Sequence, residues 1–263
     1  MTLLLASCAA PITAHAGEPA PAGGSEVVAP TSAATGAEPG PGAAPPADPW
    51  RVHAPVPRRG AATAQIVRPV AALDRPAGRE VGRLRTATRW AGQPQTLLVL
   101  GSAVHEGRRW VRVLLPGRPN GGSAWIARDA VVLHATRYWI DVALRRRSLT
   151  LWRNGRRIAR YRVVVGAPRT RTPVGLAAVF ERNRQRDPRS FVGAWVLSLT
   201  AHSDTWRRFD GGPGRIALHG RAGASLRDPL GTARSNGCIR VPERGIRRIA
   251  RLVPVGTPVR VTP

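Results

Sequence analysis

Lysine is absent from this sequence, so all 41 basic residues are arginines. Alanine, glycine and proline are abundant too, and codons rich in G and C encode all four residues, so we attribute the arginine content to codon bias. The formal net charge of +26 therefore says less about partners than its size suggests. A body this basic attracts polyanions, but Arg145-Arg146-Arg147 has no neighbouring aromatic platform, and we expect a solvated face rather than a nucleic-acid site.

Cysteine is nearly absent as well, with only Cys8 and Cys238 present. The apolar run near the N-terminus is far too short to span a bilayer. Leu5-Ala6-Ser7-Cys8 resembles a lipobox, whose acylated cysteine would anchor the protein to a membrane. The alternative is cleavage after Ala14-His15-Ala16, which would remove Cys8. Both interpretations make residues 1–16 an export segment, so we expect an extracytoplasmic protein of the periplasm or cell wall.

Large apolar residues are scarce between the export segment and the first β-prone run. Residues 17–57 consist mostly of Ala, Pro, Gly, Ser and Thr, which bury too little surface to offset the entropy of ordering, and we interpret them as a semi-extended linker. Residues 58–135 contain short β-prone runs at 64–67, 96–100, 110–115 and 124–126, separated by turn residues. With Ser123-Ala124-Trp125 after a glycine-rich turn, this part resembles bacterial SH3-like modules, which implies a small barrel. We expect Trp110 and Trp125 to fill its core.

Residues 136–263 form a second β-rich part. Asn154-Gly155 favours a type I′ hairpin turn between runs at 149–152 and 161–165. An arginine-rich loop is expected from Arg182 to Arg189, either as a solvated loop or as a lid. The one predicted helix follows Pro242 and carries apolar residues at helical spacing, and a last strand is expected at 259–261. The predicted fold class is therefore mainly β with one C-terminal helix.

The chemistry of the chain is concentrated between His219 and Arg240. Cys238 is the only cysteine outside the export segment, and free cysteine is often just a small buried hydrophobe. Ser235-Asn236-Gly237-Cys238 is instead a polar loop in which glycine lets backbone N–H groups converge on one point, as an oxyanion hole requires. An imidazole beside this thiol can take its proton and hold the thiolate as an ion pair. We therefore predict Cys238 as nucleophile and His219 as general base.

Three segments together carry a resemblance to a known family: His219-Gly220, Ser235 to Arg240, and Thr172-Pro173-Val174-Gly175. They resemble the bacterial L,D-transpeptidase catalytic domain, over about residues 137–263. The resemblance implies a β-sandwich-like catalytic domain in which a cysteine forms an acyl-enzyme with a peptidoglycan stem peptide, releases D-alanine, and passes the acyl group to an amine. We expect this reaction to need no cofactor and no metal.

By position, the resemblance implies a role for each residue of the motif. Cys238 is the nucleophile, His219 the base, and Ser235 orients His219. Asn236, Gly237 and Gly220 belong to the oxyanion hole or substrate-binding loop, with the Cys238 N–H. Arg240 supports the loop or a substrate carboxylate.

Asn236 departs from the family, which usually has a histidine at this position. An amide cannot accept a proton at neutral pH, so Asn236 argues against a mechanism that needs a second imidazole but not against the His219 mechanism. We therefore expect activity with an altered pH dependence or acceptor choice. His202 is expected near the cleft or at the polar surface. Scattered histidines and a single cysteine offer no spacing typical of a zinc site.

Three hypotheses follow from the sequence. The chain is an L,D-transpeptidase, an L,D-carboxypeptidase that uses water as acceptor, or a noncatalytic wall-binding protein that has kept the fold. Papain-like hydrolases place the cysteine before the histidine, and the opposite order here argues against that class.

Overall fold

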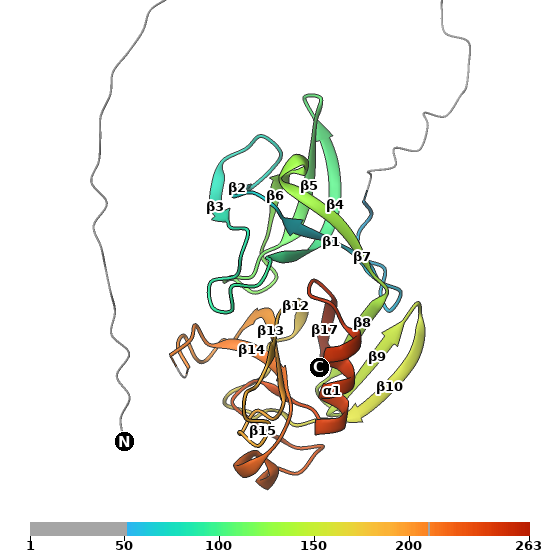
Figure 1. Cartoon of the computed structure of the whole chain (residues 1–263), viewed down its shortest axis with the longest axis vertical. Coiled ribbons are helices and arrows are strands. Elements are labelled where there is room, and N and C mark those ends of the chain that lie inside the picture. The colour runs from blue at the N-terminus through green and yellow to red at the C-terminus, as the bar shows by residue number, and fades with distance from the viewer. Residues whose placement is uncertain (1–51, 210) are drawn as a thin grey trace, which may run out of the picture. The chain divides into compact units, whose positions relative to one another are not determined.

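The computed structural model describes residues 52–209 and 211–263, and Figure 1 shows that strands dominate them. The predicted class, mainly β with one helix near the C-terminus, is confirmed. The export segment, including Cys8, and most of the predicted linker lie outside the described residues.

The first sheet has seven antiparallel strands in the order β3-β2-β6-β5-β4-β1-β7. Their bounds are β1 Ala61–Ile66, β2 Val70–Leu73, β3 Glu80–Leu84, β4 Thr96–His105, β5 Arg108–Leu114, β6 Ser123–Ala127 and β7 Val131–Thr136. A 3-10 turn, Arg128–Ala130, lies between the last two. Trp110 is buried as expected, whereas Trp125 is only half-buried. The four predicted β-prone runs all fall on strands of this sheet.

The second sheet has eight strands in the order β10-β9-β8-β17-β12-β13-β14-β16, and it curls around its core (Figure 1). Their bounds are β8 Tyr138–Ala143, β9 Ser148–Arg153, β10 Arg156–Arg162, β12 Gly175–Arg184, β13 Trp195–His202, β14 Arg215–His219, β16 Ile239–Arg240 and β17 Pro258–Thr262. Two short strands, β11 Val165–Gly166 and β15 Ala233–Ser235, pair in parallel beside it. A 3-10 turn spans Gly223–Arg227.

Local signals explain several of these elements. Asn154 and Gly155 have φ of 49° and 81°, the left-handed values that a type I′ turn needs, and they join β9 to β10. Helix α1, Glu243–Leu252, begins after Pro242 and buries Ile246, Ile249 and Ala250 completely. The predicted hairpin turn, helix and last strand are all confirmed.

The predicted arginine-rich loop begins too early. Strand β12 continues to Arg184, because Arg182 and Arg184 pair with Leu197 and Trp195 of β13. Composition alone suggested a solvated loop, but the backbone ladder extends the strand, and the connection to β13 starts only after Arg184.

The two sheets share part of their packing. Phe180, on β12, is 5% exposed and packs among the apolar residues of the seven-stranded sheet. Leu98 and Leu114 of the first sheet pack on Ala178 of the second. The hydroxyls of Thr136 and Thr257 are 3.1 Å apart in a buried hydrogen bond. The first sheet therefore supports the strand that lies in the middle of the second.

Candidate active site

The register of β14 and β16 brings the predicted nucleophile and base together. The two strands are parallel, with Leu218 opposite Ile239 and His219 opposite Arg240. Leu218 and Ile239 are fully buried in the core, so by strand alternation His219 and Arg240 project from the other face. Cys238 directly precedes β16, and the backbone of Ala217 on β14 acts on its thiol by lowering its pKa. Cys238, just before β16, and His219, at the end of β14, therefore lie at the same face of the sheet.

His219 is buried, with 4% of its surface exposed, and the backbone of Gly220 and of Val192 lies against its ring. Nδ1 lies 2.8 Å from the carbonyl oxygen of Gly220. A carbonyl only accepts, so Nδ1 carries the proton and Nε2 of the neutral ring keeps a lone pair. Burial lowers the pKa of His219 to about 4, although the Gly220 carbonyl opposes this effect. The ring is therefore neutral at pH 7 and can accept a proton.

The expected role of Gly220 in the oxyanion hole is wrong. Its N–H donates to the carbonyl oxygen of Trp195 at 3.2 Å, and its carbonyl holds His219. Because both backbone groups are engaged, Gly220 orients the base and has no donor for a substrate oxygen. The family motif suggested proximity to the substrate, but the partners of a backbone group appear only in the folded sheet.

Ser235 does not orient His219, contrary to expectation. Its hydroxyl donates to the carbonyl oxygen of Cys238 at 2.6 Å and accepts from the N–H of Gly237 at 3.2 Å. Serine readily forms such local bonds across a tight turn. Ser235 therefore fixes the shape of the cysteine loop.

These bonds also change the predicted oxyanion hole. The N–H of Gly237 is occupied by Ser235, whereas the N–H of Cys238 has no hydrogen-bond partner within residues 52–209 and 211–263. Gly237 has φ of 114°, and a Cβ there would lie 3.0 Å from Ile216 Cδ1. Glycine is thus required for the conformation of the loop, and Cys238 supplies the free donor.

Thr172, in the upstream motif, braces the cysteine loop from outside. Its hydroxyl donates to the carbonyl oxygen of Gly237 at 2.8 Å and accepts from the N–H of Gly166 at 3.0 Å. The hydroxyl of Thr170 donates to the carbonyl oxygen of Ser235 at 2.9 Å. The motif was recognised in the sequence, but this bracing function was not.

Arg240 is almost completely buried, with 5% of its surface exposed. It forms an ion pair with Asp228, and its guanidinium carbon lies 4.8 Å from the centre of the Phe191 ring. The ion pair ties the end of β16 to the segment between His219 and Cys238. This agrees with the expectation that Arg240 supports the loop.

Phe191 is a residue of this site that the sequence did not reveal. It is 47% exposed, and its ring centre lies 6.3 Å from that of His219. It belongs to the connection between β12 and β13, two residues beyond the arginine-rich stretch that was considered as a lid. A lone phenylalanine between polar and glycine residues, Ser190-Phe191-Val192-Gly193, was the available signal.

The Phe191 connection is fixed at its far end by helix α1. The N–H of Ala194 donates to Glu243 Oε1 at 3.1 Å, and the same oxygen is 3.0 Å from Arg247 Nε. A Cβ at either Gly193 or Gly220 would overlap Glu243 Oε2. The two glycines therefore allow the first turn of α1 to contact both the Phe191 connection and the residue that holds His219.

The remaining predicted positions differ in their surroundings. Asn236 is exposed, and its side chain forms no hydrogen bond with the described part of the chain.

His202 is not at the surface, because only 4% of it is exposed. It is also distant from His219 along the sheet, because it pairs with Arg215 at the opposite end of the β13–β14 ladder. Burial lowers its pKa to about 4, with Arg215 and Arg118 acting in the same direction.

The expected resting ion pair between thiolate and imidazolium is not favoured. Burial raises the pKa of the Cys238 thiol, and it lowers that of His219, so both charged forms are penalised. The backbone of Ala217 and the charge of Arg240 lower the thiol pKa but do not outweigh burial. The site therefore rests as neutral thiol and neutral imidazole.

This resting state predicts the pH dependence of alkylation by iodoacetamide. Only the thiolate reacts, and a raised pKa reduces its fraction at pH 7, so folded protein should react more slowly than the same protein in urea. The rate should keep rising with pH beyond the point at which the unfolded thiol reaches its plateau. Peptide mapping of Cys238 after timed alkylation measures this, and a plateau reached below pH 7 would instead indicate a resting thiolate.

No cluster of three metal-ligating side chains occurs among the described residues. Within the same residues, no helix has the length and apolar character needed to cross a bilayer.

Comparisons with known proteins identify the family of the second β-rich part. A family model described as YkuD, the L,D-transpeptidase catalytic domain, matches residues 137–261. The YkuD protein of Bacillus licheniformis is 32% identical over 160 residues, which cover 58% of this chain and 86% of that protein. The YkuD protein of Bacillus subtilis is 29% identical over 168 residues, which cover 62% and 92%.

The chain is also similar to solved structures of L,D-transpeptidases. The catalytic domain from Enterococcus faecium L,D-transpeptidase is 21% identical, with 48% of this chain and 96% of that chain covered and a TM-score of 0.34. The chain spans 49% of a longer form of that enzyme. On the basis of the family model and the Bacillus relatives, the chain belongs to the L,D-transpeptidase catalytic-domain family.

Proposed function

We propose that the chain is a peptidoglycan L,D-transpeptidase that forms an acyl-enzyme on Cys238. The donor is a stem tetrapeptide, the leaving group is its terminal D-alanine, and the acceptor is an amine. The observation that carries this proposal is the placement of a half-buried thiol and a neutral, carbonyl-oriented imidazole at one face of the β14–β16 pair, beside an unoccupied backbone donor.

Acylation uses each of these groups once. Sγ of Cys238 attacks the carbonyl carbon that joins the third stem residue to D-alanine, and Nε2 of His219 takes the thiol proton. The carbonyl oxygen becomes an oxyanion, which the N–H of Cys238 stabilises. The C–N bond then breaks, His219 returns the proton to the departing amine, and a thioester remains.

Transfer reverses these roles. The neutral amine of an acceptor attacks the thioester carbonyl, and His219 takes a proton from its nitrogen. The C–S bond breaks, and the proton passes to the sulfur. Because the pKa of His219 is about 4, its ring is unprotonated at neutral pH and can take this proton.

Acylation by a carbapenem, an electrophile that imitates the donor carbonyl, tests the proposal. We expect intact-mass spectrometry to show one covalent adduct on the protein and none on Cys238→Ala. The N-terminal cysteine, if retained, is excluded by peptide mapping or by Cys8→Ser as a control. An unmodified Cys238 after prolonged incubation at several pH values would support the noncatalytic wall-binding alternative.

Products separate transfer from hydrolysis. With purified stem tetrapeptide, a cross-linked dimer and free D-alanine support the transpeptidase, whereas tripeptide alone supports the L,D-carboxypeptidase. Adding a high concentration of a free D-amino acid tests whether any amine competes with water for the thioester.

The remaining parts of the proposal concern placement in the cell. We propose that residues 58–135 form an SH3-like module that positions the catalytic part on the wall. The export segment would deliver the protein outside the cytoplasm, with lipidation of Cys8 as one outcome and its removal as the other.

A further inference from the structure

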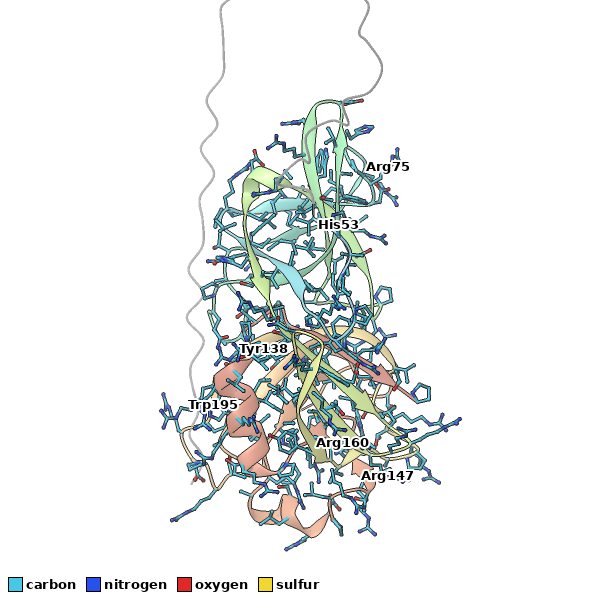
Figure 2. The ribbon with its side chains drawn as sticks, turned by 90° about the vertical axis from the view of Figure 1, so that its right-hand side faces the viewer. His53, Arg75, Tyr138, Arg147, Arg160 and Trp195 are labelled. Carbon is cyan, nitrogen blue, oxygen red and sulfur yellow. The ribbon has the colours of Figure 1, made fainter. Side chains whose placement is uncertain are left out.

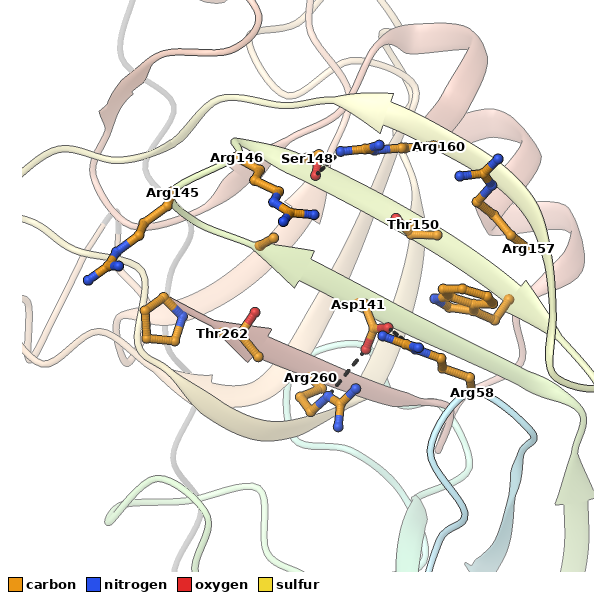
Figure 3. A pocket seen from close by; sticks show the side chains of 13 residues that line it. Arg58, Asp141, Arg145, Arg146, Ser148, Thr150, Arg157, Arg160, Arg260 and Thr262 are labelled. Carbon is orange, nitrogen blue, oxygen red and sulfur yellow. Dashed lines mark hydrogen bonds and ion pairs between the residues drawn. The ribbon is translucent and has the colours of Figure 1, made fainter.

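A basic trough lies on the outer face of the eight-stranded sheet, far from the catalytic strands in the strand order. It is formed on β10, β9, β8 and β17, whereas His219 and Cys238 lie at β14 and β16. Figure 3 shows this hollow, which has a volume of about 540 Å³. The site is therefore separate from the chemistry proposed above.

The shape of the trough follows from strand alternation. On the inner face, Ile140, Val142 and Leu149 are fully buried in the core. On the outer face, β8 and β9 present short side chains to each other. Ala143 of β8 lies opposite Ser148 of β9, and Asp141 lies opposite Thr150. Short side chains form the floor, and long arginine side chains rise around it, as Figure 3 shows. The arginines of this rim are Arg58, Arg145, Arg146, Arg157, Arg160 and Arg260.

Asp141 is the one acidic side chain that lines this hollow, and it is already paired. Asp141 Oδ2 is 3.0 Å from Arg58 Nε, and Oδ1 is 3.3 Å from Arg260 Nε. Oδ1 also accepts from Trp139 Nε1 at 2.8 Å. Arg145, Arg146, Arg157 and Arg160 form no ion pair within the described residues. Four arginines that form no ion pair among the described residues therefore surround a polar floor.

The basic surface continues beyond this hollow. A second hollow of about 410 Å³ shares Arg146, Ser148 and Arg160 with the first and adds Arg147 and Arg162. Figure 2 shows Arg147 and Arg160 near each other in the lower part of the view. A small anion would occupy only part of two adjoining hollows, so their continuity favours a linear ligand with repeated charges.

We propose that this trough binds a linear phosphate chain that carries no bases, either a polyphosphate or a phosphodiester polymer. Guanidinium groups donate paired N–H bonds to phosphate oxygens, and the hydroxyls of Ser148, Thr150 and Thr262 offer additional donors. Nucleic acid fits less well, because single-stranded binding uses free aromatic faces for base stacking. Trp152, the aromatic residue that lines the first hollow, already has Arg58 stacked 4.6 Å from its centre. Tyr161, which lines the second hollow, is partly buried and packs against the apolar core.

Binding of inorganic polyphosphate to the full chain tests the proposal, with Arg146→Gln/Arg160→Gln as the trough variant. Arg244→Gln/Arg248→Gln is the matched control, because these exposed arginines of α1 have no acidic partner among the described residues and the net charge changes equally. We expect the trough variant to bind at least about tenfold more weakly and the control to change less than about twofold. The slope of log K against log salt concentration should fall by about 1.4 in magnitude, at roughly 0.7 for each lost phosphate contact.

Equal weakening of both variants would overturn the proposal, because it would show binding by net charge alone. A base-free phosphodiester polymer, such as a glycerol phosphate chain, distinguishes the two phosphate sources. Tighter binding of single-stranded DNA or of polyglutamate with the same charge number would overturn the choice of ligand. Unchanged thermal unfolding and unchanged carbapenem acylation of the trough variant establish that fold and catalytic site are intact.

Discussion

Replacing His219 with glutamine should lower the rate of Cys238 acylation about 10²- to 10⁴-fold, the range typical of a lost general base. Glutamine preserves size and one hydrogen bond to the Gly220 carbonyl, but its amide cannot take the thiol proton. The wild-type rate should stay constant as pH falls from 7 to about 5 and decline only near pH 4, where His219 becomes protonated. A stopped-flow or timed mass assay with a carbapenem over this pH range measures both effects.

Asn236→His is the matched control for that experiment. It installs the residue usual in the family at an exposed position with no hydrogen-bond partner among the described residues, so we expect acylation to change less than about threefold. If His219→Gln retained more than a tenth of the wild-type rate, another group would be the base. If Asn236→His raised the acylation rate strongly, a second imidazole would contribute to catalysis, and the native site would lack it.

Replacing Arg240 with glutamine should destabilise the protein by about 2–4 kcal/mol. Removing one partner of a buried ion pair costs about 3–5 kcal/mol, and Asp228 is partly exposed, so water offsets some of this loss. The stacking of Phe191 on the guanidinium is lost as well. Urea unfolding at pH 7 measures the change in the free energy of unfolding.

A double-mutant cycle assigns this effect to the pair. Asp228→Asn alone should cost at least as much as Arg240→Gln, because it leaves the buried guanidinium without a partner, whereas Arg240→Gln leaves a carboxylate that water can reach. The double variant should be more stable than the sum of the two losses predicts. Arg244→Gln, on the exposed face of α1, should change stability by less than about 0.5 kcal/mol. If the changes in the free energy of unfolding of the two single variants simply added in the double variant, the ion pair would not contribute to stability.

The sequence predicted those parts of the site that depend on local chemistry. Cys238 stood out as a lone thiol in a polar loop, and His219 stood out at the end of a β-prone run. Asn154-Gly155 and the spacing in α1 predicted their elements because turns and helices depend on neighbours in the chain. The pairing of β14 with β16, which joins the two catalytic residues, required the folded sheet.

Roles that depend on partners distant in the chain could not be predicted. Gly220 was placed in the oxyanion hole or substrate-binding loop, but Trp195 accepts its N–H and the His219 ring is bound to its carbonyl. An ion pair of thiolate and imidazolium was expected for Cys238 and His219, but burial favours the neutral form of both groups. The sequence does not show how far a side chain is removed from water. Likewise, the triple arginine at 145–147 appeared to be a solvated run, and only the register of β8 to β10 shows that Arg145 and Arg146 border a hollow.

The contact of Glu243 with Gly193 and Gly220 limits how this site can diversify. A new side chain at either glycine would compete with the carboxylate for the same space and displace the backbone that aligns the base. Arg186 to Arg189, in the same connection, are exposed, and the connection is bound to α1 further along the chain, at Ala194. Substitutions of these exposed side chains should therefore leave the imidazole in place.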